Sequence, residues 1–208
     1  MRPGPIIIRR CSVCTKFIEQ DTIDSGNTCD ARFWTDGKLD APMMPDQPWL
    51  VKCLHCGALV WINEQEEVGE IGPLGLDKGP FTDALPYETP SADDYFSFLQ
   101  KGMPEGEKER YVRLRAWWAG NDSRREGGNP TPLSNEEVAN LYAFSVLLDD
   151  SDENDHILKA EIMRELNQFD DALALLSAPF HEQLNYAAAI IRNLSVQRIP
   201  FVREIFFE

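Results

Sequence analysis

Two pairs of closely spaced cysteines constrain the fold of this chain more than any other feature. Cys11 and Cys14 form the first pair, and Cys53 and Cys56 form the second, with two residues between the cysteines of each pair. This spacing lets one tight turn direct two thiolates at one metal ion, and two such turns complete a tetrahedral site of four sulfurs. The spacing therefore predicts that these four cysteines hold one structural Zn²⁺.

Other roles for the cysteines agree less well with their surroundings. A redox-active pair usually opens a helix within a β-α-β unit, whereas short segments typical of strands flank both pairs here. A catalytic zinc needs an open coordination position, and four thiolates leave none. We expect the fifth cysteine, Cys29, to be a small buried apolar side chain rather than an alternative ligand. We expect His55 to be exposed or to lie just outside the ligand shell.

Residues 1–63 have the pattern of a small β module. Strands are predicted next to the cysteine pairs, over Ile6–Ile8, Trp49–Lys52 and Gly57–Ile62. Phe33–Leu39 is typical of a hairpin, because its Asp-Gly pair tolerates the positive φ angles of a two-residue turn.

The two cysteine pairs and the glycine after the last cysteine, Gly57, resemble the zinc-ribbon family over about residues 6–63. The resemblance implies a small three-stranded sheet with zinc at one end. It also implies a role in binding proteins or nucleic acids rather than in catalysis. The segment from Trp34 to the second pair further resembles a stretch of uncharacterised bacterial proteins, which implies no function.

The rest of the chain is predicted to be a linker followed by a helical domain. Residues 64–90 are rich in glycine and proline and are expected to connect the two parts. Residues 91–208 are expected to form an acidic α-helical domain, a helical hairpin or a bundle, which makes the fold class α+β. Helices are predicted over Ala92–Lys101, Glu105–Ala119, Ser134 to about Leu148, His156–Leu166, Asp170–Ser177 and Leu184–Ser195, with a final short helix from Pro200.

Two of these predicted helix boundaries depend on particular residues. Gly120 is expected to end the second helix, and Ser134 with Glu137 has the spacing of a capping box. The segment Asn167–Leu173 resembles the turn between the two helices of a tetratricopeptide repeat, with Ala160 and Ala172 as the small residues where these helices cross. That resemblance implies part of a peptide-binding groove, but a plain helical hairpin is an equal alternative, because only one such unit is visible.

The charge of the chain is unevenly distributed. The net charge is −15, and residues 1–63 contain seven basic and seven acidic residues. Residues 64–208 contain 13 basic and 28 acidic residues, so this part should repel nucleic acid and anionic membranes. The acidity either attracts a basic partner or only keeps the protein soluble. The N-terminus lacks the pattern of a secretory signal, and no apolar run approaches the length of a membrane span. With the paired cysteines, this composition predicts a cytoplasmic protein.

No catalytic motif accompanies these features, so we expect a non-enzymatic protein-interaction module that serves as an adaptor, regulator or inhibitor. One cluster has the composition of a binding hot spot and is a candidate partner-binding site: Arg115, Trp117 and Trp118. The alternative for these tryptophans is that one packs in the core and the other covers a domain contact. A second hypothesis is a nucleic-acid-associated factor that uses Arg9, Arg10, Lys16, Arg32, Lys38 and Lys52. A third is an enzyme with a site between the two domains.

Overall fold

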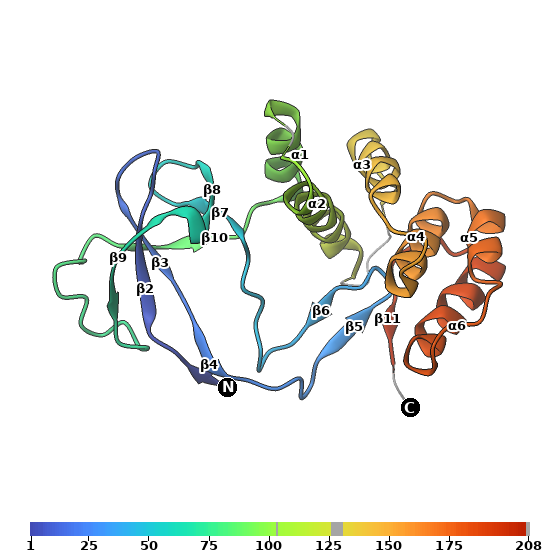
Figure 1. Cartoon of the computed structure of the whole chain (residues 1–208), viewed down its shortest axis with the longest axis horizontal. Helices are drawn as coiled ribbons and strands as arrows, with labels where there is room; N and C mark the ends of the chain where they lie inside the picture. Colours follow the sequence, from blue (N-terminus) through green and yellow to red (C-terminus); the bar gives the residue numbers. More distant parts are fainter. Residues whose placement is uncertain (103, 126–130, 207–208) are drawn as a thin grey trace. The chain divides into compact units, whose positions relative to one another are not determined.

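A computed structural model describes residues 1–102, 104–125 and 131–206, and Figure 1 shows its strands and helices along the chain. Both kinds of element are present, which confirms a mixed α+β protein. The chain separates into two compact units. The N-terminal unit comprises Met1–Ala31 and Asp40–Asp94, and the C-terminal unit comprises Arg32–Leu39 and Tyr95–Glu208.

The N-terminal unit is built on a six-stranded sheet with the order β8-β7-β10-β3-β2-β9 (Figure 1). Its pairs are antiparallel except for β10 and β3, which run parallel. Two short strands, β1 (Arg2–Pro3) and β4 (Ile23–Ser25), pair separately. The six strands are β2 (Ile6–Arg10), β3 (Phe17–Gln20), β7 (Leu50–Cys53), β8 (Leu59–Trp61), β9 (Glu66–Ile71) and β10 (Leu85–Glu88).

Strand alternation places two small apolar clusters in this unit. Along β2, Ile6 and Ile8 are buried while Ile7 is partly exposed, as expected for a strand with one face on a core. Ile6 and Ile8 pack with Ile71 and Ala84 in one cluster. The second cluster surrounds two of the paired cysteines and consists of Cys11, Ile18, Val51, Cys53, Val60 and Ile62.

The segment 64–90, which we expected to be a linker, begins at the last residue of the 3₁₀ turn Ile62–Glu64 and contains β9 and β10. One of its glycines, Gly69, permits close packing. At Gly69, an added Cβ would overlap the ring of Phe81, so the aromatic side chain lies directly on the β9 backbone. Composition alone did not distinguish a glycine-rich strand from a connector, because both lack large apolar side chains.

Six α-helices are present among the described residues, and α2 to α6 lie in the C-terminal unit. Helix α2 packs on α3 and α3 on α4, whereas α4, α5 and α6 pack on one another (Figure 1). None of the described helices combines the length and apolar character needed to cross a membrane. The helices are α1 (Ala92–Lys101), α2 (Glu107–Arg125), α3 (Asn135–Val146), α4 (Glu153–Glu165), α5 (Phe169–Leu175) and α6 (Glu182–Val196).

The predicted hairpin exists but belongs to the C-terminal unit rather than to the β module. It consists of β5 (Arg32–Trp34) and β6 (Leu39–Asp40), which form a three-stranded sheet with β11 (Glu204–Ile205). The Trp34 N–H donates to the Lys38 carbonyl at 3.0 Å, so the loop has three residues rather than the expected two. Of the Asp-Gly pair, only Gly37 has a positive φ, +78°. The final helix predicted from Pro200 is wrong, because β11 pairs with β5 there.

The two predicted helix ends have different outcomes. The capping box of Ser134 and Glu137 is confirmed, with both reciprocal hydrogen bonds present. The prediction that Gly120 ends the second helix is wrong, because α2 continues to Arg125. An added Cβ at Gly120 would overlap a carboxylate oxygen of Glu137, so this glycine allows α2 and α3 to approach closely. Residues 126–130, between the second and third predicted helices, lie outside the described residues.

Helices α4 and α5 form a tight hairpin at the segment that resembles a tetratricopeptide turn. Asn167 has φ +63° at the connection, a left-handed conformation that asparagine tolerates better than most residues. Ala160 and Ala172 are fully buried, on helices that pack together. A relationship to repeat proteins stays a prediction.

Candidate functional site

The first cysteine turn directly follows β2. The Cys11 N–H donates to the Lys16 carbonyl at 2.9 Å, and the Thr15 N–H donates to the Cys11 carbonyl at 2.9 Å. Thr15 has φ +63°, a conformation that costs a β-branched residue about 1–2 kcal/mol. The turn tolerates this strain because the Thr15 hydroxyl donates to the Cys14 carbonyl at 2.7 Å.

The second cysteine turn repeats this geometry at the end of β7. The Cys53 N–H donates to the Ala58 carbonyl at 2.9 Å, and the Gly57 N–H donates to the Cys53 carbonyl at 2.8 Å. Gly57 has φ +71° and occupies the position of Thr15 in the first turn. Nothing lies within 4 Å of an added Cβ at Gly57, so glycine serves the backbone conformation there and not the packing.

The two turns bring four sulfurs together. The Sγ atoms of Cys11, Cys14, Cys53 and Cys56 all lie within 4.8 Å of one another, and those of Cys14 and Cys53 are 3.8 Å apart. Zn–S bonds of about 2.3 Å place the corners of a sulfur tetrahedron about 3.8 Å apart. The cluster therefore has the size and the soft donor set of a four-sulfur metal centre.

The four sulfurs differ in their exposure. Cys11 and Cys53 are buried, Cys14 is half-buried and Cys56 is exposed. Burial raises the pKa of the Cys53 thiol to about 12, because a bare thiolate is poorly solvated there. A bound cation supplies the charge that such a site needs to keep its sulfurs as thiolates.

One buried polar residue that supports the first turn was not identified from the sequence. The Gln65 side chain accepts from the Ser12 N–H at 2.8 Å and donates to the Trp61 carbonyl at 3.0 Å. Gln65 thereby connects the turn to the end of β8. His55 is half-buried, with Nε2 3.1 Å from the Phe17 carbonyl, and it is not in the group of possible ligands.

Cys29 departs from our expectation. It is exposed rather than buried, and it is not among the clustered cysteines. Its backbone N–H is held by the Asn27 side chain at 3.0 Å in a local turn. The prediction of a buried apolar role was wrong because this turn lies on the surface, away from both apolar clusters of the unit.

The candidate partner-binding residues on α2 have internal roles. Trp117 is buried and its indole N–H donates to Glu165 at 2.9 Å. Trp118 donates to the Asp36 carbonyl at 3.0 Å. The guanidinium of Arg115 lies over the rings of Tyr111 and Trp118, 5.6 and 5.5 Å from their centroids. Binding of a partner by Arg115 and the accessible part of Trp118 stays a prediction.

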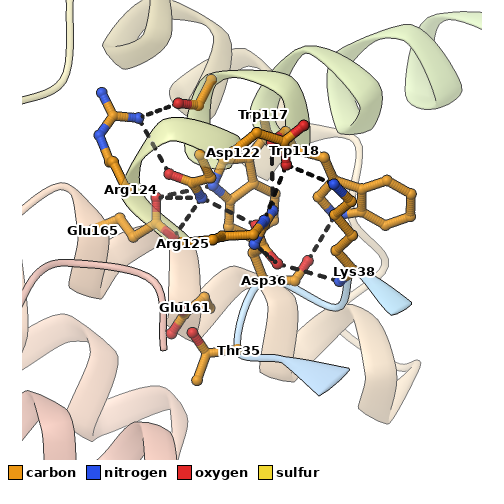
Figure 2. A network of polar contacts seen from close by, with 12 residues as sticks. Thr35, Asp36, Lys38, Trp117, Trp118, Asp122, Arg124, Arg125, Glu161 and Glu165 are labelled. Carbon is orange, nitrogen blue, oxygen red and sulfur yellow. Dashed lines mark hydrogen bonds and ion pairs between the residues drawn. The ribbon is translucent and has the colours of Figure 1, made fainter. Parts of the chain in front are cut away.

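A cluster of buried charges in the C-terminal unit was not predicted (Figure 2). The hairpin loop directs Asp36 at α2, where it meets Arg125 and Asn121. Helix α4 contributes Glu161, Arg164 and Glu165. Arg124 of α2 and Glu137 of α3 form a further ion pair. This buried ionic cluster comprises Asp36, Arg124, Arg125, Glu137, Glu161, Arg164 and Glu165.

Three pairs in the buried ionic cluster are bidentate arginine–carboxylate ion pairs. Arg124 binds Glu137 at 2.7 and 2.9 Å. Arg125 binds both oxygens of Asp36, and Arg164 binds both oxygens of Glu161. The same Arg164 also donates to the carbonyls of Ile199 and Phe201, and so fixes the segment that leads into β11.

Glu165 is the remaining carboxyl of the cluster and is held by neutral donors. It accepts from Trp117, and the Asn121 amide donates to both of its oxygens at 3.0 and 3.2 Å. Burial, together with the charges of Glu161 and Asp36, raises the pKa of Glu165 to about 8 against the opposing effect of Arg164. Burial also raises the pKa of Asp36 to about 6, against the opposing effect of Arg125.

Comparison with known proteins adds no assignment to this geometry: no family model, no curated protein and no solved structure matches the chain.

Proposed function

We propose that Cys11, Cys14, Cys53 and Cys56 bind one Zn²⁺ in a structural role. The strongest support is that the same turn geometry occurs twice and places all four Sγ atoms within 4.8 Å of one another. Four sulfurs fill the coordination shell of the ion, so no position is left for a substrate or a catalytic water.

The location of the site explains what the ion would stabilise. Cys11 follows β2, Cys53 ends β7, and two other strands, β10 and β3, lie between these in the sheet. An ion held by both turns therefore links strands that are not neighbours. A unit with two small apolar clusters gains much of its folding free energy from such a link.

We further propose that the protein is a non-enzymatic interaction module, an adaptor, regulator or inhibitor, with a basic protein as its partner. The saturated metal site and the net charge of −15 support this proposal. A cytoplasmic location suits it, because a reducing compartment keeps zinc-binding cysteines from forming disulfides.

The ion pairs of the chain weigh against the alternative of nucleic-acid binding. Each of the six basic residues considered for phosphate contacts has an acidic partner within 4 Å, so no unpaired cationic face is formed by these residues. The pairs are Arg9–Glu67, Arg10–Glu66, Lys16–Asp83, Arg32–Glu204, Lys38–Asp122 and Lys52–Asp94.

Metal analysis and partner capture test the two parts of the proposal separately. We expect one equivalent of zinc per chain in wild type and in Cys29→Ser, and little zinc in Cys14→Ser.

Chemical cross-linking in cells of the native host, followed by mass spectrometry, should identify a basic protein whose capture weakens as salt rises. Well under one metal ion per chain would contradict the first part. Micromolar binding of mixed-sequence DNA or RNA at about 0.15 M salt would contradict the second.

A further inference from the structure

A cavity of about 360 Å³ opens within the C-terminal unit beside the buried ionic cluster. Its walls come from the end of α2, residues 131–133, α3, the end of α4 and residues 200–201. The apolar part of the wall includes Leu133, Val138, Leu166 and Phe201, and the charged part is formed by Arg124 and Glu165. This volume lies in the range of small-molecule sites, about 300–1,000 Å³.

The two charged residues of the wall are not equally available to a ligand. Arg124 uses its donors on both oxygens of Glu137 and on the carbonyls of Gly120, Thr131 and Pro132. A ligand with an anionic group would therefore have to displace contacts that are already made. Arg124 shapes the cavity without offering it a positive charge.

Glu165 is the one carboxyl of the buried ionic cluster that no arginine binds directly, although Arg164 acts on it from a greater distance. The other three carboxylates, Asp36, Glu137 and Glu161, each bind an arginine through both oxygens, whereas Glu165 forms no ion pair among the described residues. Three arginines thus face four carboxyl groups. Buried carboxylates are stable only when they are paired or protonated.

We infer that this cavity binds a small organic cation, a primary amine or guanidine with an apolar body, whose charged group pairs with Glu165. The apolar body packs on Leu133, Val138 and Phe201, and the cation takes the place of the proton that otherwise neutralises Glu165. The chemistry is shared by free amines and by the side chain of a lysine on a partner protein.

The protonation of Glu165 supports this assignment. Its pKa of about 8 means that the carboxyl binds a proton at neutral pH when no cation is present. The groups around it are Glu161 and Arg164 on α4, Asp36 on the hairpin, Arg124 and Arg125 on α2, and Glu137 and Tyr142 on α3. An ammonium group in the cavity favours the ionised form, so the Glu165 O–H bond breaks and its proton is released to solvent.

Titration with three probes of similar size tests the inference on the full chain. The probes are 2-phenylethylamine, the neutral 2-phenylethanol and the anionic phenylacetate, measured by calorimetry and ligand-observed NMR at pH 7. We expect the amine to bind with a dissociation constant of about 1 mM, as is usual for a fragment of this size, and at least about tenfold more tightly than the alcohol. Calorimetry in two buffers of different ionisation enthalpy should show release of close to one proton per amine bound.

Two variants and one control assign the binding to this cavity. Glu165→Gln keeps the size of the side chain and an acceptor for Trp117 or Asn121, and should weaken amine binding about tenfold or more and abolish proton release. Val138→Phe should block the cavity for all probes. The control Glu182→Gln, at the exposed start of α6, should change neither amine binding nor proton release.

The source of the cation follows from one further probe, the peptide acetyl-Gly-Lys-Gly-amide. Tighter binding of this peptide than of 2-phenylethylamine supports a lysine on a partner protein, and weaker binding supports a free amine. Equal binding of the amine and the alcohol, or amine binding that Glu165→Gln leaves unchanged, would overturn the inference. Amine binding without proton release in wild type would overturn it as well.

Discussion

The N-terminal unit concentrates its polar chemistry in two short turns, whereas the C-terminal unit collects its buried charges from four separate segments. Each cysteine turn spans four residues and its backbone–backbone hydrogen bonds are local, with one long-range contact from the Gln65 side chain to the first turn. The buried ionic cluster joins the hairpin loop, α2, α3 and α4, with Asp36 and Arg125 separated by 89 positions in sequence. A local turn can form its geometry before the unit folds, but the ionic cluster exists only when all four segments have packed.

This difference predicts how each unit responds to the loss of one polar group. A metal site loses its closed shell when a single ligand is removed, so its stabilisation disappears as a whole. An ionic cluster loses one pair and leaves the partner charge buried, which costs a few kcal/mol. We therefore expect loss of the metal to lower stability more than loss of one buried ion pair.

The largest effect is expected from removal of the metal. Structural zinc sites contribute about 10–16 kcal/mol of apparent binding free energy at pH 7, so chelation or Cys14→Ser should unfold the N-terminal unit. Most of the helical circular dichroism should remain, because α2 to α6 belong to the other unit. Urea unfolding followed at 222 nm measures this. Cys29→Ser, an exposed cysteine outside the site, is the matched control. Loss of the helical signal together with the metal would show that the two units unfold as one.

The second-largest loss of stability is expected from Arg164→Met. The side chain of Arg164 is fully buried and binds Glu161, Thr35 and two backbone carbonyls. Its removal leaves the buried Glu161 unpaired, which should lower the free energy of unfolding by about 3–5 kcal/mol. The control is Arg203→Met at an exposed position, which should change stability by less than about 0.5 kcal/mol.

A double variant sharpens this prediction. Glu161→Leu combined with Arg164→Met replaces the whole pair by apolar side chains, and should recover much of the stability lost in Arg164→Met alone. Denaturant midpoints of the single and double variants give the comparison. Equal loss in both would show that Arg164 stabilises the fold through its contacts with the carbonyls of Ile199 and Phe201 rather than through Glu161.

The same difference explains what the sequence could predict. The four cysteines, the hairpin turn at Gly37 and the capping box at Ser134 were identified because each depends on residues within a short window. The unit to which the hairpin belongs was not identified. The aromatic residues before its turn suit a β module equally well, and only the helical unit reveals the partners of Asp36.

One pattern in α2 could have indicated the buried ionic cluster. Trp117, Asn121 and Arg124 follow one another at intervals of four and three residues, so they share a helix face. Polar residues on the face of a buried tryptophan indicate a buried polar network rather than a solvated surface. Their carboxylate partners lie on other elements, and spacing within one helix cannot predict them.

A smaller effect is expected from Gly120→Ala. The added methyl group would overlap the Glu137 carboxylate, which caps α3 and binds Arg124. The two helices must separate slightly, so we expect a loss of about 1–3 kcal/mol, although alanine is otherwise the better helix former. Gly102→Ala provides the control, because nothing lies within 4 Å of its added Cβ. A gain in stability at Gly120 would indicate that Glu137 moves without cost.

The smallest effect is a pH dependence of the C-terminal unit. The folded-state pKa values of Asp36 and Glu165 are raised to about 6 and about 8, above the values of about 3.9 and 4.3 for unfolded chains. Between these limits the folded state binds more protons than the unfolded state, so this contribution to stability is fully present below about pH 4 and is lost as pH rises through about 6 for Asp36 and about 8 for Glu165. Each group contributes at most about 1.4 kcal/mol per pH unit, so we expect a loss of about 2 kcal/mol between pH 6 and pH 8, most of it from Glu165. Urea midpoints at 222 nm measure it, and Glu165→Gln should flatten the upper part of the curve because the glutamine has no proton to lose. A midpoint that rises over this interval would mean that the arginines, rather than burial, control the charge of the buried ionic cluster.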